Sequence, residues 1–414
     1  MRNPKIRFKG YADAWEQRKF SDVFTGLQNN TLSRSELNYE SGTVKNVHYG
    51  DVLIKFGDYI DASKEELPFI NDDSKVEKFK GSFLHNGDIV IADTAEDETV
   101  GKCTEIQGVD DIKLISGLHT IPCRPKEEYG AKFLGYYMNS SAYHAQLIPL
   151  MQGIKVTSIS KSALQDTNMI IPKSVDEQTI IGEYFFNLDH LITLHQRKCE
   201  EIKTLKKFML QKMFPQNGEN VPEIRFDGFT DAWEQRKFGE LYEVNNERNK
   251  DLIGYDKTFS IATMTYKGEG NGAADSSLSN YKVLRIGDIA FEGHTNKEFR
   301  YGRFVANDIG DGIMSPRFSA LRPLFQMPVS FWKYYIHFEP IMKRKLICST
   351  KAGTMMNELV TADFFEQSIL VPSIDEQTKI GEFLSSLAHL ITLHQRKCDE
   401  LQSIKKFMLQ NMFV

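Results

Sequence analysis

Apolar residues recur at every seventh position in two stretches of the chain. The first series consists of Ile181, Leu188, His195, Ile202 and Met209, with Tyr184, Leu191 and Leu205 in a companion position. The second consists of Ile380, Leu387, His394, Leu401 and Met408, with Phe383, Leu390 and Ile404 as companions. Heptad spacing of this kind predicts long helices with coiled-coil seams. Because a globular segment lies between them, we expect the two helices to pack on each other in antiparallel orientation.

Both stretches carry the same start signal. Pro172 and Pro372 precede Ser174-x-x-Glu177 and Ser373-x-x-Glu376, the spacing of a capping box. In such a box, the serine and the glutamate side chains satisfy free amides in the first turn of a helix. The predicted helical segments are 172–214 and 372–414.

The same two phrases occur in both halves of the chain. The segment Ile6 to Phe20, which contains Ala-Trp-Glu-Gln-Arg-Lys, returns almost unchanged at Ile224 to Phe238, and the helix that starts near Asp176 returns near Asp375. The residues between the phrases differ, apart from three landmarks. These are Gly87-Asp88-Ile89 with Gly287-Asp288-Ile289, Arg124-Pro125 with Arg322-Pro323, and a closing Ile-Ile-Pro with Leu-Val-Pro. We therefore predict a pseudo-two-fold internal repeat, one fold that carries two divergent surfaces.

The two middle segments alternate short apolar runs with turns rich in Gly and Asp. Strands are expected at residues 52–54, 88–91 and 288–291, and helices near 133–147 and 328–345. This mixture predicts an α+β class, a mixed α/β fold. The expected domains are 1–171, a first spacer helix 172–214, a linker 215–223, a second domain 224–371 and a second spacer helix 372–414.

Composition narrows the class of protein. The net charge of -5 disfavours a simple nucleic-acid binder, since Lys and Arg normally neutralise the phosphates. The five cysteines form no C-x-x-C pair, which disfavours a disulfide framework or a zinc site. No apolar run approaches the length of a membrane span, so we expect a cytoplasmic protein without a membrane contact.

Catalytic motifs are absent from the sequence. There is no P-loop, and the histidines show no metal-binding spacing, so no metal and no cofactor is expected. His195 with His394 is interpreted as a polar seam pair that fixes register rather than as a metal or pH-sensitive pair. A nuclease centre would need two carboxylates and a lysine, for which Asp93 with Asp111 and Lys113 is the nearest match. That spacing is common by chance, and the second half lacks a counterpart.

The repeated Trp-Glu-Gln-Arg-Lys phrase has two interpretations. Its tryptophan could pack on the following domain, or the phrase could bind a partner twice. The candidate partner-docking residues are Trp15, Arg18 and Lys19 in the first copy and Trp233, Arg236 and Lys237 in the second.

Several loops of the middle segments combine cations with amides and hydroxyls, groups that bind phosphates and base edges. In the first half the candidate DNA-binding residues are Asn29, Asn30, Ser33, Arg34, Lys155 and Thr157. In the second half they are Arg248, Asn249, Lys250, Arg300, Arg303, Lys351 and Thr354.

The layout of these phrases resembles the specificity (S) subunits of type I restriction-modification systems. The resemblance covers essentially the whole chain and is carried by Ala-Trp-Glu-Gln-Arg-Lys and by Pro followed by Asp-Glu-Gln in both halves. It implies two target recognition domains, each of which reads half of a bipartite site in double-stranded DNA. It also implies paired helices that set the unread gap, two methyltransferase (M) subunits and a restriction (R) subunit as partners, and no catalysis by the chain itself. The alternative is a coiled-coil adaptor with two protein-binding heads.

Overall fold

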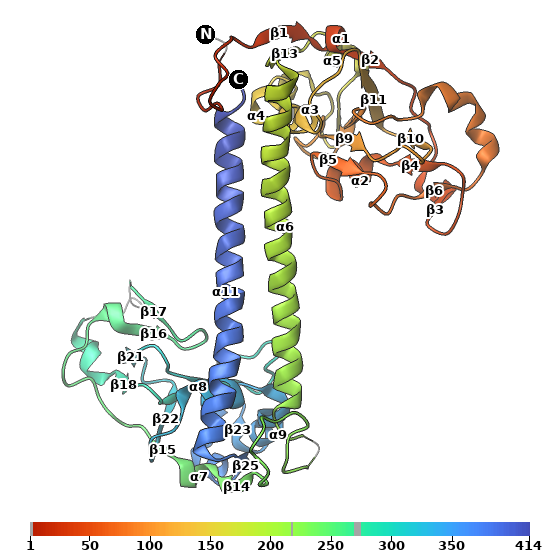
Figure 1. Ribbon diagram of the computed structural model, residues 1–414. Coiled ribbons are helices and arrows are strands. Elements are labelled where there is room, and N and C mark those ends of the chain that lie inside the picture. Colours follow the sequence, from red (N-terminus) through yellow and green to blue (C-terminus); the bar gives the residue numbers. More distant parts are fainter. Residues whose placement is uncertain (1–2, 217, 269–274) are drawn as a thin grey trace. The chain divides into compact units, whose positions relative to one another are not determined.

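The chain divides into two compact units. The computed structural model describes residues 3–216, 218–268 and 275–414. The first unit comprises Met1–His195 with Arg396–Val414, and the second comprises Gln196–Gln395. Each unit therefore contains part of both long helices, α6 (Val175–Lys212) and α11 (Ile374–Asn411) (Figure 1). No helix of the described residues is both long enough and apolar enough to cross a membrane.

The first unit is built on two sheets. The larger has the order β2 (Phe24–Gly26), β11 (Thr120–Pro125), β7 (Ile89–Ala92), β9 (Cys103–Gln107) and β5 (Tyr59–Asp61). The smaller has the order β10 (Leu114–Ser116), β4 (Lys45–Val47), β6 (Phe69–Ile70) and β3 (Leu37–Asn38). Two short pairs are β1 (Glu16–Lys19) with β13 (Asn168–Ile171), and β8 (Thr94–Ala95) with β12 (Thr157–Ser158). The helices are α1 (Phe20–Val23), α2 (Tyr49–Ile54), α3 (Phe133–Asn139), α4 (Ser141–His144) and α5 (Lys161–Gln165).

The second unit repeats this plan with one strand fewer in its main sheet. That sheet has the order β15 (Tyr242–Val244), β22 (Ser319–Pro323), β19 (Ile289–Glu292) and β20 (Arg303–Ala306). The other sheet has the order β17 (Thr265–Lys267), β16 (Thr258–Ser260), β21 (Gly312–Met314) and β18 (Lys282–Leu284). The short pairs are β14 (Glu234–Lys237) with β25 (Ser368–Val371), and β23 (Thr350–Lys351) with β24 (Glu358–Leu359). The helices are α7 (Phe238–Leu241), α8 (Val329–Tyr335), α9 (Glu339–Ser349) and α10 (Thr361–Phe365).

The repeated phrases meet in the structure. The Glu-Gln-Arg-Lys segment forms β1 in the first unit and β14 in the second, and each pairs antiparallel with the strand that precedes the long helix. Ahead of this strand, Arg7 binds Glu177 with an N–O distance of 2.6 Å, and Arg225 binds Glu376 at 2.7 Å. In each unit, two phrases that are far apart in the sequence thus contact each other, and this explains why both are repeated. We call these contacts the frame.

Only half of the capping-box prediction is confirmed. The hydroxyls of Ser174 and Ser373 accept the backbone N–H of Glu177 and Glu376, both at 3.3 Å. The glutamate side chains are occupied by the arginines of the frame and do not return to the start of the helix. A buried guanidinium binds a carboxylate more strongly than a backbone amide does.

The antiparallel pairing of α6 and α11 is confirmed within each unit. In the first unit the Cys398 Sγ lies 3.7 Å from the Ile192 carbonyl oxygen, and in the second the Cys199 Sγ lies 3.8 Å from that of Ile391. Residues on the predicted seven-residue step, such as Ile181 and Leu401, are buried.

The predicted companion series was wrong at four of its six positions. The buried companions are Phe185, Ile192 and Cys199 in α6 and Leu384 and Cys398 in α11, which lie four residues after the main series. The expected companions Leu191, Leu205, Leu390 and Ile404 are exposed. Residues three and four positions away are both neighbours on a helix, so the apolar stripe alone did not decide which side faces the partner helix.

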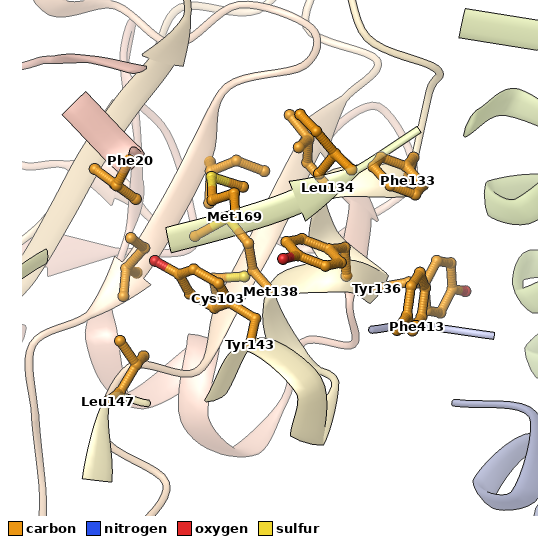
Figure 2. Close-up of a cluster of buried hydrophobic side chains, with 14 of the residues drawn as sticks. Phe20, Cys103, Phe133, Leu134, Tyr136, Met138, Tyr143, Leu147, Met169 and Phe413 are labelled. Atoms are coloured by element: carbon orange, nitrogen blue, oxygen red, sulfur yellow. The ribbon is translucent and has the colours of Figure 1, made fainter. Parts of the chain in front are cut away.

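Each unit's core receives the end of the long helix that comes from the other half of the sequence. Phe413, which follows α11, packs against Trp15, Phe185 and the aromatic residues of α3, and Figure 2 shows it beside Tyr136 and Phe133. In the second unit, Phe214 follows α6 and packs in the same way against Trp233 and Phe331. These contacts tie the helix ends to the repeated tryptophan phrase.

Two local predictions were wrong. Residues 52–54 belong to the helix α2, because the His48 side chain accepts the Gly50 N–H and starts a helical turn there. The two predicted longer helices are each interrupted. The first divides into α3 and α4 around Ser140, whose backbone is extended, and the second divides into α8 and α9. The strands at Ile89–Ala92 and Ile289–Glu292 agree with the prediction.

Candidate nucleic-acid interface

One end of each main sheet is held by an ion pair from the repeated landmarks. Arg124 binds Asp88 through two nitrogens at 2.9 and 2.7 Å, and Arg322 binds Asp288 at 2.9 and 2.8 Å. Both aspartates are buried. Bidentate pairing of this kind fixes orientation as well as charge. These repeated residues therefore stabilise the scaffold, and we expect the groups that read bases at other positions.

The other end of the same strands carries exposed polar residues. Since β7 and β11 run antiparallel with Thr120 opposite Ala92, the residues Asp93 and His119 lie at the end away from the ion pair. In the second unit Ser319 lies opposite Phe291, so His294 and Arg317 lie at the corresponding end. Loops on a rigid scaffold are the usual place for recognition.

The 29–34 loop of the first unit lies beside this end. Asn29 donates to the Gly117 carbonyl at 3.3 Å, and Arg34 is exposed and binds Asp51 at 2.7 Å. The hydrogen bond to Asp51 raises the pKa of Arg34. Burial, followed by the charge of Arg34, lowers the pKa of the neighbouring His48. Arg34 therefore remains a cation on the surface.

Two candidates of this loop shape it rather than face solvent. Asn30 is buried, donates to Asn46 at 2.6 Å and accepts the Leu32 N–H. Ser33 bonds to Glu36. Sequence reasoning grouped these residues with Arg34 because amides and hydroxyls serve both loop geometry and recognition.

The second candidate segment of the first unit joins the same end of the sheet. β12 pairs with β8, and the Thr157 hydroxyl donates to the Ala95 carbonyl at 3.2 Å. Lys155 is exposed in the loop before β12. The Ile159 N–H donates to the Asp93 carbonyl, so this segment is fixed directly beside the end of β7.

In the second unit, two of the three candidate loops come together. Asn357 donates through its side chain to the Arg300 carbonyl at 3.4 Å and through its backbone to Gly293. Arg303 lies over the Phe299 ring at 4.8 Å, and Lys351 binds Glu358 at 3.2 Å. Thr354 lines a hollow of about 660 Å³ together with His294 and Arg317.

The third loop, residues 245–250, lies along β18. Arg248 is exposed and donates to the Asn280 carbonyl at 2.6 Å. Asn249 is buried and bonds to the backbone of Ile253 and Leu278, so it holds the loop in place. Lys250 is exposed.

Two carboxylate–histidine pairs at these strand ends escaped the sequence analysis. Asp93 Oδ1 lies 3.4 Å from His119 Nδ1, and Glu292 Oε1 lies 2.6 Å from His294 Nδ1. The first pair could not be predicted from the sequence, since its members are distant in the chain. Asp93 had been considered as a nuclease carboxylate. Within residues 3–216, 218–268 and 275–414, no group of three His, Cys, Asp or Glu is placed to hold a metal ion.

The partner-docking candidates divide into core and surface residues. Trp15 and Trp233 are buried in the cores of their units. Arg18 binds Glu127, Lys19 binds Asp166, Arg236 binds Glu240 and Lys237 binds Glu366. Each cation is thus paired with an acid of its own unit.

The long helices expose a set of large apolar side chains, which we call the outer helix residues. They are Leu191, Leu194, Leu205 and Phe208 of α6 and Leu390, Leu393, Ile404 and Phe407 of α11. Exposed apolar residues that recur along one side of a helix indicate an interaction surface. Four of them, Leu191, Leu205, Leu390 and Ile404, belong to the companion series that the heptad spacing predicts for the seam. His195 and His394 are half-buried in the first and second unit, respectively.

Comparison with known proteins identifies the family. A model of the type I restriction modification DNA specificity domain matches residues 12–204 and 328–403. A putative type I restriction enzyme MjaX specificity subunit of Methanocaldococcus jannaschii is 20% identical over 418 residues, which cover 95% of this chain and 91% of that protein. The crystal structure of a type I restriction-modification system S subunit from M. genitalium has the same fold, with a TM-score of 0.61, 13% identity and coverage of 100% and 99%. The chain belongs to the type I restriction modification DNA specificity domain family.

Proposed function

We propose that this chain reads the DNA target of a type I restriction-modification complex as two separate half-sites. The observation that supports this most directly is the contrast within each unit. The frame residues Arg7, Glu177, Arg225 and Glu376 make the same contacts twice, whereas the exposed loop ends carry different residues. Two readers of different sequence on one repeated scaffold suit a bipartite target.

The candidate DNA-contacting residues are those of the loops that remain exposed. Arg34 and Lys155 in the first unit and Arg248, Lys250, Arg300, Lys351 and Thr354 in the second are themselves exposed, and Asn29, Thr157 and Arg303 in the same loops are half-buried. The buried Asn30 and Asn249 support the loops. The net charge of -5 fits this function if the partner subunits supply much of the phosphate contact.

The outer helix residues are the surface that we assign to two methyltransferase subunits. Methylation of adenine and cleavage of DNA then belong to the methyltransferase and restriction partners, and the chain itself performs no catalysis. A cytoplasmic location follows from this function and stays a prediction. A coiled-coil adaptor with two protein-binding heads would use the same helices but would give no sequence-specific DNA binding.

The test is to express the chain with its methyltransferase partner and to map methylated adenines by single-molecule sequencing. We expect methylation at one motif made of two short defined parts with an unspecified gap. Ile404→Asp with Phe407→Asp should abolish methylation by preventing assembly, whereas Ile54→Asp, at an exposed apolar residue of α2, should not. Methylation without a defined motif, or with a single continuous motif, would contradict the proposal.

A matched deletion tests the function of the helices. Removal of residues 195–201 and 394–400 takes one heptad from both helices, spares the outer helix residues and leaves Ile192 and Ile391 to continue the seam. Seven residues correspond to about 10 Å of helix, or roughly three base pairs at 3.4 Å each. We expect the gap in the methylated motif to shorten by about this amount while both half-sites stay the same. An unchanged gap would refute the spacer function, and deletion from one helix alone should prevent assembly.

A further inference from the structure

We infer that each unit reads one base pair through a histidine that a carboxylate orients, His119 with Asp93 in the first unit and His294 with Glu292 in the second. This inference rests on the proposed function and goes further, because it names the reading group and its chemistry. Neither histidine was among the loop candidates of the sequence analysis.

The pair in the second unit is the tighter one. Glu292 Oε1 accepts the backbone N–H of His294 at 3.0 Å and lies 2.6 Å from its Nδ1. The carboxylate side chain is only 5% exposed, whereas the imidazole is 60% exposed. A carboxylate that already accepts one N–H acts as an acceptor, so the ring nitrogen that faces it must carry the hydrogen. In the neutral ring this leaves Nε2, the other nitrogen of the 60% exposed imidazole, with its lone pair free to accept.

The first unit builds the pair from different elements. Asp93 follows β7, and His119 precedes β11, the strand next to β7. The Asp93 carboxylate accepts the Thr94 hydroxyl at 2.7 Å and lies 3.4 Å from His119 Nδ1. The ring of His119 packs edge-on against Tyr49 with centroids 5.3 Å apart, and its side chain is 48% exposed.

The backbone of His119 is held in an uncommon conformation. Its φ of 54° lies in the left-handed region, which is rare for residues other than glycine. The Asp93 N–H donates to the His119 carbonyl at 3.1 Å and fixes this turn. Strained backbone at an exposed loop end is often associated with a functional site. Here it places the imidazole next to the Asp93 carboxylate.

The two pairs occupy the same strand end although their residues do not correspond. Aligned on Gly87-Asp88 and Gly287-Asp288, the segment Ala92-Asp93-Thr94 matches Glu292-Gly293-His294, so the acid and the histidine both change position. In both units the adjoining segment is a DNA-binding candidate. Ile159 bonds to Asp93 after the Lys155 loop, and Asn357 bonds to Gly293 after the Thr354 loop. By contrast, residues that are needed only for the scaffold, such as Asp88 and Asp288, occupy equivalent positions in the two copies.

The exposed Nε2 acceptor defines the base chemistry. In the major groove only the exocyclic amino groups of adenine and cytosine donate hydrogen bonds. We therefore assign each histidine to an adenine or a cytosine. In the second unit, Arg317 and Thr354 line the hollow beside His294 and would restrict how the base edge enters.

The experiment uses the complex with its methyltransferase partner and maps methylated motifs for His119→Ala and His294→Ala. Each variant should relax one position of one half-site, with roughly ten- to hundred-fold weaker discrimination there, and should leave the other half-site unchanged. The two variants should affect opposite half-sites. The unaffected half-site reports that the complex has folded and assembled, and Lys343→Ala, an exposed lysine on α9, serves as a control that should keep the wild-type motif.

Glu292→Gln and Glu292→Leu test the orienting function. Because one Glu292 oxygen both accepts the His294 backbone N–H and faces Nδ1, the glutamine carbonyl oxygen can take over both contacts and keep the tautomer, so the preferred base should stay the same. Glu292→Leu removes the acceptor and should weaken discrimination at the position that His294→Ala relaxes. Wild-type motifs in both histidine variants would overturn the inference and leave the proposed function intact. If His294→Ala abolished methylation, a wild-type motif in His294→Phe, which keeps an aromatic ring but lacks the acceptor, would overturn it equally. Failure of the wild-type complex to methylate a bipartite motif would instead refute the proposed function.

Discussion

The two units surround an equivalent, partly buried lysine differently. Lys405 of α11 lies 2.9 Å from Asp58 and 2.7 Å from Asp189, whose other oxygen accepts the Tyr136 hydroxyl. The repeat places Lys206 of α6 at the equivalent position, and there it lies 4.6 Å from the centre of the Tyr334 ring. Asp189 is replaced by Ala388 in the second copy. Near-identical helices therefore make contacts of different strength with the domains they support.

The same contrast extends to the frame. Trp15 donates its indole N–H to Glu177 at 3.3 Å, whereas the indole N–H of Trp233 is buried without a hydrogen-bond partner among the described residues. The repeat reproduces shape more faithfully than it reproduces polar contacts. The two units should accordingly differ in stability where their sequences look most alike, and paired variants measure that difference.

The largest effect is expected at the helix ends, where the units agree. Phe413→Ala and Phe214→Ala each remove a buried ring from an aromatic cluster and should cost about 3–5 kcal/mol in the free energy of unfolding. Hydrogen exchange followed by mass spectrometry on the isolated chain should show the loss of protection within the unit that holds the ring. Phe407→Ala, at an exposed phenylalanine, is the control and should change stability by less than about 0.5 kcal/mol. Undiminished protection in the ring's own unit would contradict the assignment of these cores.

A smaller effect on the free energy of unfolding, different in the two units, is expected at Lys405 and Lys206. Lys405→Met leaves Asp58 and Asp189 without their cation and should cost about 2 kcal/mol, less than a fully buried pair because all three groups keep some exposure to water. Lys206→Met should be neutral or slightly stabilising. Burial, with Lys333 nearby, lowers the pKa of Lys206, which means that the folded state disfavours its charge. Urea unfolding at pH 7 measures both, and equal effects of the two variants would refute the asymmetry.

The pH dependence of the two lysines has opposite signs. Burial alone would lower the pKa of Lys405, but Asp58 and Asp189 raise it, so its contribution is present at neutral pH and is lost as pH rises through the folded value above about 10.4. For Lys206, the unfolded chain binds more protons between the lowered pKa and about 10.4, so stability increases with pH in that range. Wild type and Lys206→Met should therefore converge as the pH approaches 10.

The sequence allowed the frame and the helices to be predicted because they depend on local periodicity and on repetition. The seam of Ile181 and Leu188 follows from heptad spacing, and the α+β class follows from the alternation of short apolar runs with turns. The sequence did not show whether the side of α6 that carries Leu191 is buried or exposed. Apolar residues three positions after the main series look like part of the seam until the position of the partner helix is known. The prediction of buried seam positions for Leu191, Leu205, Leu390 and Ile404 was therefore wrong.

The candidate site depended on contacts that local patterns do not contain. Arg34 and Lys155 could be named as exposed loop cations from composition, but Asn30 looks identical to a recognition residue until its bond to Asn46 is seen. His119 could not be connected with Asp93, because only the antiparallel register of β7 and β11 brings them together. Recognition surfaces formed by strand ends are in this respect harder to predict than the scaffold beneath them.

The smallest effect is expected at the repeated tryptophans, where a single hydrogen bond distinguishes the two units. Trp15→Phe and Trp233→Phe remove the same volume from equivalent cores, but only the first also loses a hydrogen bond to a carboxylate. Trp233→Phe instead removes a buried donor that has no partner, so Trp15→Phe should cost about 1 kcal/mol more in the free energy of unfolding. A double-mutant cycle with Glu177→Gln assigns the difference, since the coupling energy should appear for Trp15 with Glu177 and be absent for Trp233 with Glu376. Equal coupling in both units would show that the frame is energetically as symmetric as its sequence, and that the 3.3 Å contact contributes nothing of its own.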